Sequence, residues 1–151
     1  MKNENKFLDK HEARELAIET LYALDFNDQI LNSPDLTNLP GKNEAEMKEL
    51  SEEVLFYARY LITGVLSHIE EIDNMISKYS INRPLDKINI VDRNVLRISV
   101  FSLLFEKDLH PSIVINEAVK LSQEMSTDVT YKFINGILDA ISKKEISRWF
   151  S

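Results

Sequence analysis

Length, composition and charge place the chain among globular proteins with one hydrophobic core. It has 151 residues, of which 44% are hydrophobic and 28% are charged, so a disordered or collagen-like polymer is excluded. The absence of cysteine excludes disulfides, thiolate metal sites and cysteine nucleophiles, and is typical of a reducing cytoplasm. The net charge of −7 argues against indiscriminate nucleic-acid binding but leaves room for a local basic face. We expect a single domain over residues 1–151.

Neither a membrane span nor a secretion signal is expected. The longest nearly apolar stretch, residues 98–105, contains two serines and falls far short of the roughly 18 residues that cross a bilayer. The polar N-terminus lacks the apolar region of a signal peptide. The sequence therefore predicts a cytoplasmic protein without membrane contact.

Helical periodicity predicts an all-α fold. Glycine and proline are few and fall mostly where helices should stop. Apolar residues recur at helical spacing over residues 9–26. Residues 27–42 contain Pro34, Pro40 and Gly41 and predict a long surface loop.

The middle of the chain predicts a second helical region. Asn43 and Glu46 have the spacing of a capping box, in which the two side chains satisfy backbone amides at the start of a helix. The apolar pattern continues from there to Tyr79 and allows a break near His68. A turn is expected at residues 80–84, because the proline in it lacks an amide donor.

Three further helices are expected in the C-terminal half. Residues 88–106 are apolar on almost every side of the helical wheel, which is typical of a central helix. Pro111 fits the first position of the next helix, to about Glu124. The last helix is expected over residues 128–143. Gly136 inside it costs about 1 kcal/mol relative to alanine, which predicts a close helix contact or a close ligand approach.

Searches for catalytic and cofactor-binding motifs are negative. The three histidines lie on different predicted segments, and none completes a di-iron pair. The three glycines build neither a P-loop nor a dinucleotide-binding turn. We expect no catalytic residue, no metal site and no cofactor.

The first predicted helix carries a candidate contact surface. Tyr22 falls about 180° from Ala13 on the helical wheel, away from the core stripe, with His11, Arg14 and Ile18 beside it. Such a row can stack on bases, donate to phosphates or seat an apolar partner. Alternatively, a second layer of helices covers Ile18 and Tyr22.

Four other positions have more than one interpretation. Lys132 and Phe133 offer a cation and an aromatic edge, although Phe133 also fits a core position. Tyr79 is either a packing aromatic or a second stacking platform. Asp92, in the first turn of the central helix, is explained by the helix dipole, which favours a carboxylate there by about 0.3–1 kcal/mol.

Four motifs in the same order resemble the NusB family of transcription antitermination factors. They are Ala13-Arg14-Glu15 with Ala17 and residues 21–24, then residues 91–98, 115–121 and 132–139. The resemblance covers residues 9–143 and leaves out the loop at 27–42 and the tail at 144–151.

The resemblance implies a fold, a role and partners. The implied fold is two packed three-helix bundles with about seven helices. The implied role is that of a non-catalytic adaptor that helps RNA polymerase to continue elongating. The implied partners are NusE, a ribosomal protein of the small subunit, and a boxA-type RNA element of ribosomal leaders.

The resemblance also assigns two groups of site residues. The RNA side comprises Lys6, Lys10, His11, Arg14, Tyr22, Tyr79, Lys132 and Phe133. The NusE side comprises Asp92 and Tyr22.

The N-terminal segment departs from the family pattern. NusB proteins often carry several consecutive arginines there, whereas residues 1–25 hold four Lys or Arg and six acidic side chains, a net charge of −2. Fewer cations predict weaker RNA binding by this chain alone and a greater dependence on NusE.

Two other functions are compatible with the sequence. The acidic balance favours a helical protein–protein interaction module without direct RNA binding. A NusB-like domain also resembles an accessory domain of some ribosomal RNA cytosine methyltransferases, although we expect no catalytic domain that binds a cofactor within these 151 residues.

Overall fold

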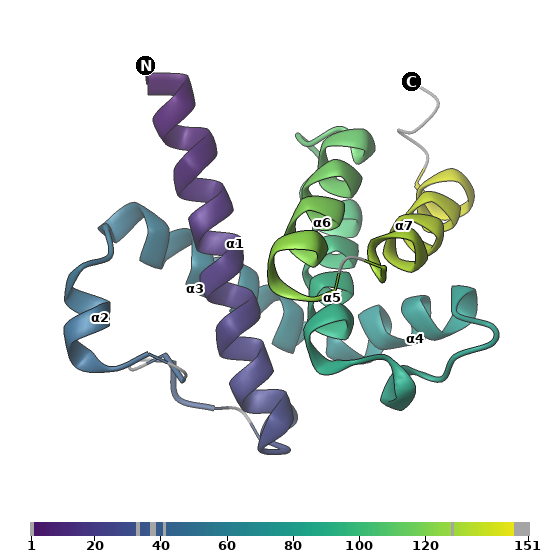
Figure 1. Ribbon diagram of the computed structural model, residues 1–151, viewed down its shortest axis with the longest axis horizontal. Helices are drawn as coiled ribbons and strands as arrows, with labels where there is room; N and C mark the ends of the chain where they lie inside the picture. Colours follow the sequence, from purple (N-terminus) through teal and green to yellow (C-terminus); the bar gives the residue numbers. More distant parts are fainter. Residues whose placement is uncertain (1, 33, 37–38, 41, 128, 147–151) are drawn as a thin grey trace. The chain divides into compact units, whose positions relative to one another are not determined.

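The computed structural model contains only helices and connecting segments in the part of the chain that it describes (Figure 1). The described residues are 2–32, 34–36, 39–40, 42–127 and 129–146, with side chains from Asp9 onward. The elements are α1 (Lys2–Phe26), α2 (Glu44–Lys48), α3 (Glu52–Ser67), α4 (Ile69–Tyr79), the 3-10 helix η1 (Leu85–Lys87), α5 (Ile90–Phe105), α6 (Pro111–Met125) and α7 (Tyr131–Glu145). The all-α prediction is confirmed. None of the described helices has the length and hydropathy needed to cross a bilayer.

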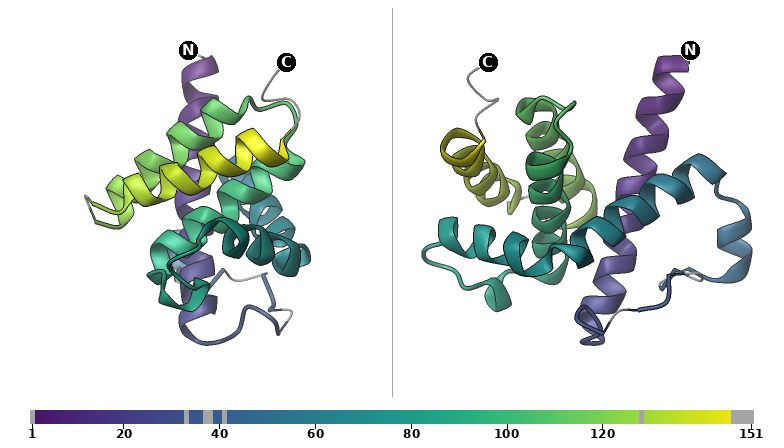
Figure 2. Two further views of the ribbon diagram at one scale, coloured as in Figure 1. Left: turned by 90° about the vertical axis from the view of Figure 1, so that its right-hand side faces the viewer. Right: turned by 180° about the vertical axis from the view of Figure 1, so that it is seen from behind.

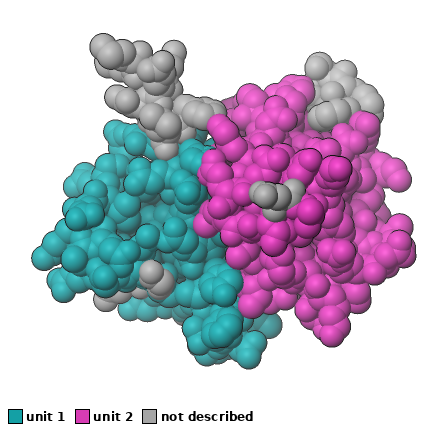
Figure 3. All heavy atoms as spheres, in the orientation of Figure 1, with its two compact units in different colours: residues 1–67 teal, residues 68–151 magenta. Residues whose placement is uncertain are grey.

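The chain divides into two compact units, residues 1–67 and residues 68–151 (Figure 3). Unit 1 holds α1 to α3, and unit 2 holds α4 to α7 with η1.

Helices α1 and α3 form the core of unit 1. They pack on each other, and Figure 2 shows α3 crossing α1. Both helices bury apolar side chains at helical spacing: Ala13, Leu16, Ala17, Ile18, Leu21 and Leu24 from α1, and Val54, Ala58, Leu61, Ile62 and Val65 from α3.

The loop that follows α1 is anchored to unit 1. Leu39 is buried, although it lies in a segment predicted as a surface loop. The Arg59 side chain donates from Nε to the carbonyl oxygen of Leu36 at 3.2 Å. Lys42 Nζ lies 2.8 Å from a carboxylate oxygen of Glu19. One apolar and two polar contacts therefore hold this long connection.

The helix predicted from Asn43 onward is two helices. The capping box is confirmed, because Asn43 Oδ1 accepts from the Glu46 amide at 2.8 Å and Glu46 Oε1 accepts from the Asn43 amide at 3.2 Å. Helix α2 ends at Lys48, whereas the sequence predicted that it would continue. Ser51 Oγ then accepts a hydrogen bond from the amide of Val54 at 3.1 Å. A serine that bonds to the backbone in this way starts a new helix, which is α3.

Helix α5 is the central element of unit 2. It packs against α4, α6 and α7, and α6 lies beside α7 (Figures 1 and 2). Eleven of its 16 residues are buried, which confirms the predicted central helix. Arg97 is among them, and its Nε and Nη2 atoms donate to the two carboxylate oxygens of Asp73 at 2.9 and 3.0 Å. This two-point ion pair joins α5 to α4.

Other helix ends in unit 2 follow the sequence closely. His68 is the N-cap of α4, Ser80 is its C-cap, and Pro111 begins α6. Helix α7 begins at Tyr131 and extends to Glu145, three residues later at its start and two residues later at its end than expected. Of the tail, residues 147–151 lie outside the described residues.

Candidate nucleic-acid interface

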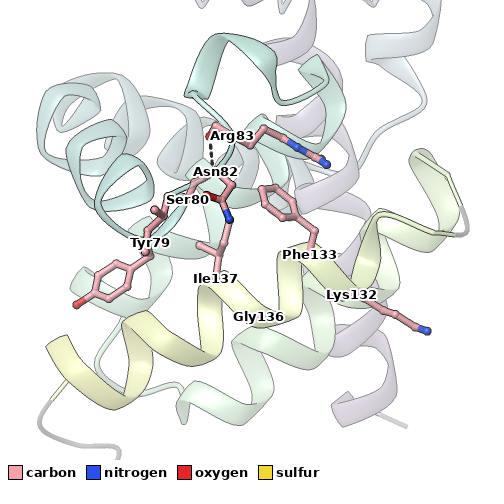
Figure 4. A pocket seen from close by; sticks show the side chains of 9 residues that line it. Tyr79, Ser80, Asn82, Arg83, Lys132, Phe133, Gly136 and Ile137 are labelled. Atoms are coloured by element: carbon pink, nitrogen blue, oxygen red, sulfur yellow. Dashed lines mark hydrogen bonds between the residues drawn. The ribbon is translucent and has the colours of Figure 1, made fainter.

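A pocket of about 440 Å³ opens in unit 2 where the segment after α4 faces α7 (Figure 4). Its volume falls in the range of small-ligand sites. It is lined by Tyr79, Ser80, Ile81, Asn82, Arg83, Lys132, Phe133, Gly136 and Ile137. Three of the predicted RNA-side residues, Tyr79, Lys132 and Phe133, therefore meet in one place.

The turn at residues 80–84 forms one wall of the pocket. Helix α4 stops at Tyr79, and Ser80 Oγ donates to the carbonyl oxygen of Arg83 at 2.5 Å, the dashed line in Figure 4. Pro84 follows and has no amide to continue a helix. The short turn therefore brings Arg83 to the α7 side of the pocket.

Arg83 and Phe133 make the main contact across the pocket. The Arg83 guanidinium carbon lies 4.5 Å from the centroid of the Phe133 ring, which is a cation–π contact, and the side chains point toward each other in Figure 4. Lys132 is exposed and extends away from Arg83 (Figure 4). Sequence reasoning missed Arg83. The available signal was a cation in the turn directly after Tyr79.

Gly136 lines the pocket from α7. A Cβ atom added there would meet no heavy atom within 4 Å, so close helix packing does not explain this glycine. That part of the sequence prediction is wrong. Of the two explanations offered by the sequence, close ligand approach is the one still compatible with the structure.

The Tyr79 side chain is held by charged neighbours. Its hydroxyl donates to Glu145 Oε2 at 2.5 Å, and Lys78 Nζ donates to the same oxygen at 2.8 Å. The hydrogen bond to Glu145 raises the pKa of Tyr79, and the hydrogen bond from Lys78 lowers the pKa of Glu145. The Nζ atoms of Lys78 and Lys144 lie 5.5 and 5.8 Å from the centroid of the Tyr79 ring.

Two residues of the row expected on α1 are not on an open face. Arg14 is 7% exposed and Ile18 is 1% exposed. The Arg14 guanidinium carbon lies 5.8 Å from the centroid of the Tyr57 ring of α3. For Ile18 the covered alternative holds, and for Arg14 the expectation of an open position is wrong, because the buried arc of α1 is wider than one apolar stripe.

The remaining N-terminal candidates are more accessible. Tyr22 is 39% exposed, and its ring stacks on that of Phe26 with centroids 6.0 Å apart. Lys10 is exposed, and its Nζ lies 5.6 Å from the centroid of the Tyr57 ring. The half-buried His11 pairs with Glu15 at 3.5 Å. Of the two alternatives that the sequence left open for Tyr22, the structure shows the exposed one, while the side chain of Lys6 lies outside the described residues.

Asp92 is 1% exposed and acts inside unit 2. Its carboxylate accepts from Asn89 Nδ2 at 2.6 Å and from the hydroxyls of Ser122 and Ser126 at 3.1 Å each. These bonds tie the first turn of α5 to the C-terminal end of α6. The carboxylate that the resemblance places on the NusE side is therefore buried and bonded within unit 2.

Comparison with known proteins identifies the family. The sequence profile of the NusB family matches residues 11–143. The chain belongs to the NusB family. The transcription antitermination protein NusB of Leptospira biflexa is 40% identical over 91% of this chain and 94% of that protein. The corresponding protein of Treponema denticola is 36% identical over 89% of this chain and 96% of its own length.

Solved structures agree with this assignment. T. maritima NusB superimposes with a TM-score of 0.74 at 30% identity, covering 92% of this chain and 94% of that one. A structure of antitermination factors NusB and NusE in complex with dsRNA gives a TM-score of 0.68 at 31% identity, with 89% and 96% covered. The predictions of a NusB-type fold and of a family of antitermination factors rather than enzymes are confirmed.

Proposed function

We propose that this NusB family member is a non-catalytic adaptor in transcription antitermination, acting in the cytoplasm. It binds boxA-type leader RNA together with NusE and helps RNA polymerase to continue elongating through ribosomal RNA genes. The observation that carries the proposal is the pocket in which Arg83 faces Phe133 beside Tyr79 and Lys132. The similarity to a NusB that forms a complex with NusE and dsRNA supports it.

The pocket combines the groups that RNA recognition needs. An aromatic ring such as Phe133 stacks on a base, and the planar guanidinium of Arg83 offers a second stacking face and donors for phosphate. Lys132 supplies an exposed cation on the adjacent position of α7. Gly136 leaves space for a close approach to the helix backbone. We therefore assign base contact to Phe133 and phosphate contact to Lys132.

The cations near the pocket matter more for RNA binding there than the negative net charge of the whole chain. The net charge is −7, yet Arg83 and Lys132 line the pocket, and Lys78 and Lys144 flank the Tyr79 ring. Charged groups that are more than about 10 Å away are largely screened at physiological salt. An RNA strand at the pocket therefore meets four cations and one nearby carboxylate, Glu145, which pairs with Lys78.

Unit 1 carries its own proposed contact residues. The exposed pair Tyr22 and Phe26 offers an apolar surface for NusE at one end of α1. Toward the other end, Lys10 and Lys6 are the proposed phosphate contacts. Arg14 is buried against Tyr57, so we assign it a role in fixing α1 on α3.

A titration of labelled boxA leader RNA, followed by fluorescence anisotropy with and without NusE at several salt concentrations, tests joint recognition. NusE should tighten RNA binding, and RNA should tighten NusE binding by the same factor, because coupling between two sites is reciprocal. Equal RNA affinity with and without NusE contradicts joint recognition.

Lys132→Ala tests the phosphate assignment. It should weaken binding of all RNA sequences alike and reduce the slope of log affinity against log salt by about 0.7, the value for one phosphate contact on a single strand. Lys107→Ala is the matched control, because Lys107 is exposed in the turn between α5 and α6 and does not line the pocket. Equal slopes for the two variants would contradict the assignment.

The second candidate function is a protein–protein interaction module that does not touch RNA. The acidic net charge of the chain favours it. NusE binding without any RNA binding at low salt, where electrostatic attraction is strongest, would establish this alternative.

A further inference from the structure

Glu145 places a carboxylate at the hydroxyl end of Tyr79, one of the residues that line the proposed RNA pocket. It lies at the C-terminal end of α7, and its Oε2 atom accepts from both Lys78 Nζ and the Tyr79 hydroxyl. Lys144 approaches the ring of the same tyrosine. The Glu145 carboxylate therefore accepts from two neighbouring residues of α4, and one of them, Tyr79, also lines the pocket.

The two donors that hold Glu145 are donors that bind phosphate in nucleic-acid complexes. Lysine ammonium groups and tyrosine hydroxyls both contact backbone phosphate oxygens. The Glu145 oxygen thus accepts from the same kinds of donor as a backbone phosphate oxygen does.

We propose that Lys78, Tyr79 and Lys144 form a phosphate-binding extension of the pocket, and that Glu145 fills it as an internal competitor in the free protein. RNA binding displaces the carboxylate and takes over its two hydrogen bonds. The inference rests on the proposed function, because it concerns the same RNA site.

Lys78 and Glu145 are accessible enough for a phosphate to replace the carboxylate. The side chain of Lys78 is 62% exposed, and that of Glu145 is 22% exposed. An ion pair near the surface is weak, since water and salt screen it. A backbone phosphate that arrives with further contacts at Phe133 and Arg83 therefore replaces the Glu145 carboxylate at little cost.

Helix α7 contains a matched control for this carboxylate. Asp139 pairs with Lys143 of the same helix at 3.1 Å and does not line the pocket. Asp139→Asn and Glu145→Gln each remove one negative charge from α7, but only the second removes the charge that holds Lys78. The difference between them isolates the local competition from the change in net charge.

Anisotropy titrations of boxA RNA with the full chain compare the two variants. Glu145→Gln should tighten RNA binding roughly twofold to fivefold at low salt, the range expected for removing one exposed ion pair. It should also steepen the salt slope, because Lys78 becomes available for a phosphate. Asp139→Asn should have a smaller effect on both. Equal effects of the two variants, or weaker binding by Glu145→Gln, would overturn the proposal.

A second variant tests whether the gain passes through Lys78. In a Lys78→Ala background, Glu145→Gln should no longer tighten RNA binding, because the cation that it releases is absent. A gain that persists in this background would overturn the proposal.

A measurement without RNA tests the internal contact itself. Ultraviolet titration of the phenol, with Tyr79→Phe as the reference that identifies the Tyr79 signal, should show the pKa of Tyr79 falling toward its ordinary value in Glu145→Gln. An unchanged pKa would mean that Glu145 does not hold Tyr79 in solution, and the competitor role would be wrong.

The outcomes separate this proposal from the proposed function. If the wild type binds RNA and Phe133→Ala weakens that binding, while Glu145→Gln matches Asp139→Asn, only the phosphate-binding extension fails. If the wild type binds no RNA at low salt, with or without NusE, both proposals fail.

Discussion

The guanidinium group of Arg83 stacks over the ring of Phe133 at 4.5 Å, joining the turn after α4 to the first turns of α7. Each side chain limits the movement of the other, so the aromatic ring and the cation are prearranged at the pocket. A ligand that binds there meets a formed site and loses less affinity to ordering of side chains.

Phe133→Ala should weaken binding of boxA RNA by about 1–3 kcal/mol, the usual cost of removing an aromatic ring that stacks on a base. Anisotropy measures the affinity. Phe56→Ala is the matched control, because Phe56 of α3 is 76% exposed and does not line the pocket. If Phe133→Ala binds RNA like the wild type, Phe133 is only a packing residue.

Gly136→Ala should separate stability from binding. The substitution should raise the free energy of unfolding by about 1 kcal/mol, because alanine favours a helix and its Cβ meets no neighbour. It should lower RNA affinity, because the methyl group enters the pocket. Asn135→Ala, at an exposed position of the same helix that does not line the pocket, should leave RNA affinity unchanged. Unchanged affinity in Gly136→Ala would mean that no ligand approaches the backbone there.

Asp92→Ala should lower the free energy of unfolding by about 1–3 kcal/mol, because it leaves the hydroxyl of Ser122 buried without its acceptor on Asp92. Chemical denaturation measures the change. Asp86→Ala, at an exposed position of η1, should shift stability by less than about 0.5 kcal/mol. If the Asp92→Ala protein is stable but fails to bind NusE, Asp92 contacts NusE directly despite its burial.

The Glu145 contact should make stability depend on pH at the acidic end. Hydrogen bonds from Lys78 and Tyr79 lower the pKa of Glu145 below its ordinary value of 4.5. A lowered carboxyl pKa stabilises the fold above the unfolded value, and this contribution is lost as the pH falls through the folded value. In thermal unfolding, the wild type should therefore be more stable than Glu145→Gln at pH 7, and this difference should shrink as the pH falls to 3. A difference that is constant over this range would contradict the assignment.

Tyr22→Ala should weaken NusE or RNA binding while changing the thermal midpoint little, because the side chain is 39% exposed. Leu31→Ala serves as the control, since Leu31 is 79% exposed in the loop after α1. A large fall in the midpoint of Tyr22→Ala, without a change in binding, would assign Tyr22 a packing role.

Much of the fold could be read from the sequence because its causes are local. The apolar period, the Asn43 capping box and the proline that opens α6 act within a few residues of the chain. The central position of α5 also follows from its composition, since a helix that is apolar all round must be covered. The break at Ser51 was missed because the apolar period continues past it. A serine on an exposed helix face and a serine that caps a new helix look the same in such a pattern.

The site depended on contacts between distant parts of the chain. Lys132 and Phe133 were identified from a motif, and Tyr79 from its place beside the turn at residues 80–84. The contacts of Phe133 with Arg83 and of Tyr79 with Glu145 exist only once α4, the turn after it and α7 pack in unit 2. A helical wheel predicts the direction in which a side chain points but not the residues that it contacts.

Sequence by itself determined most of the helices and the family, and it named most of the candidate site residues, because periodicity, capping and motifs are properties of neighbouring residues. Tertiary structure alone decided that Arg14 and Asp92 are buried, that Tyr22 is exposed, and that the Glu145 carboxylate accepts from Lys78 and Tyr79. Burial and electrostatic pairing depend on distances in space, and those distances are set by how the helices pack.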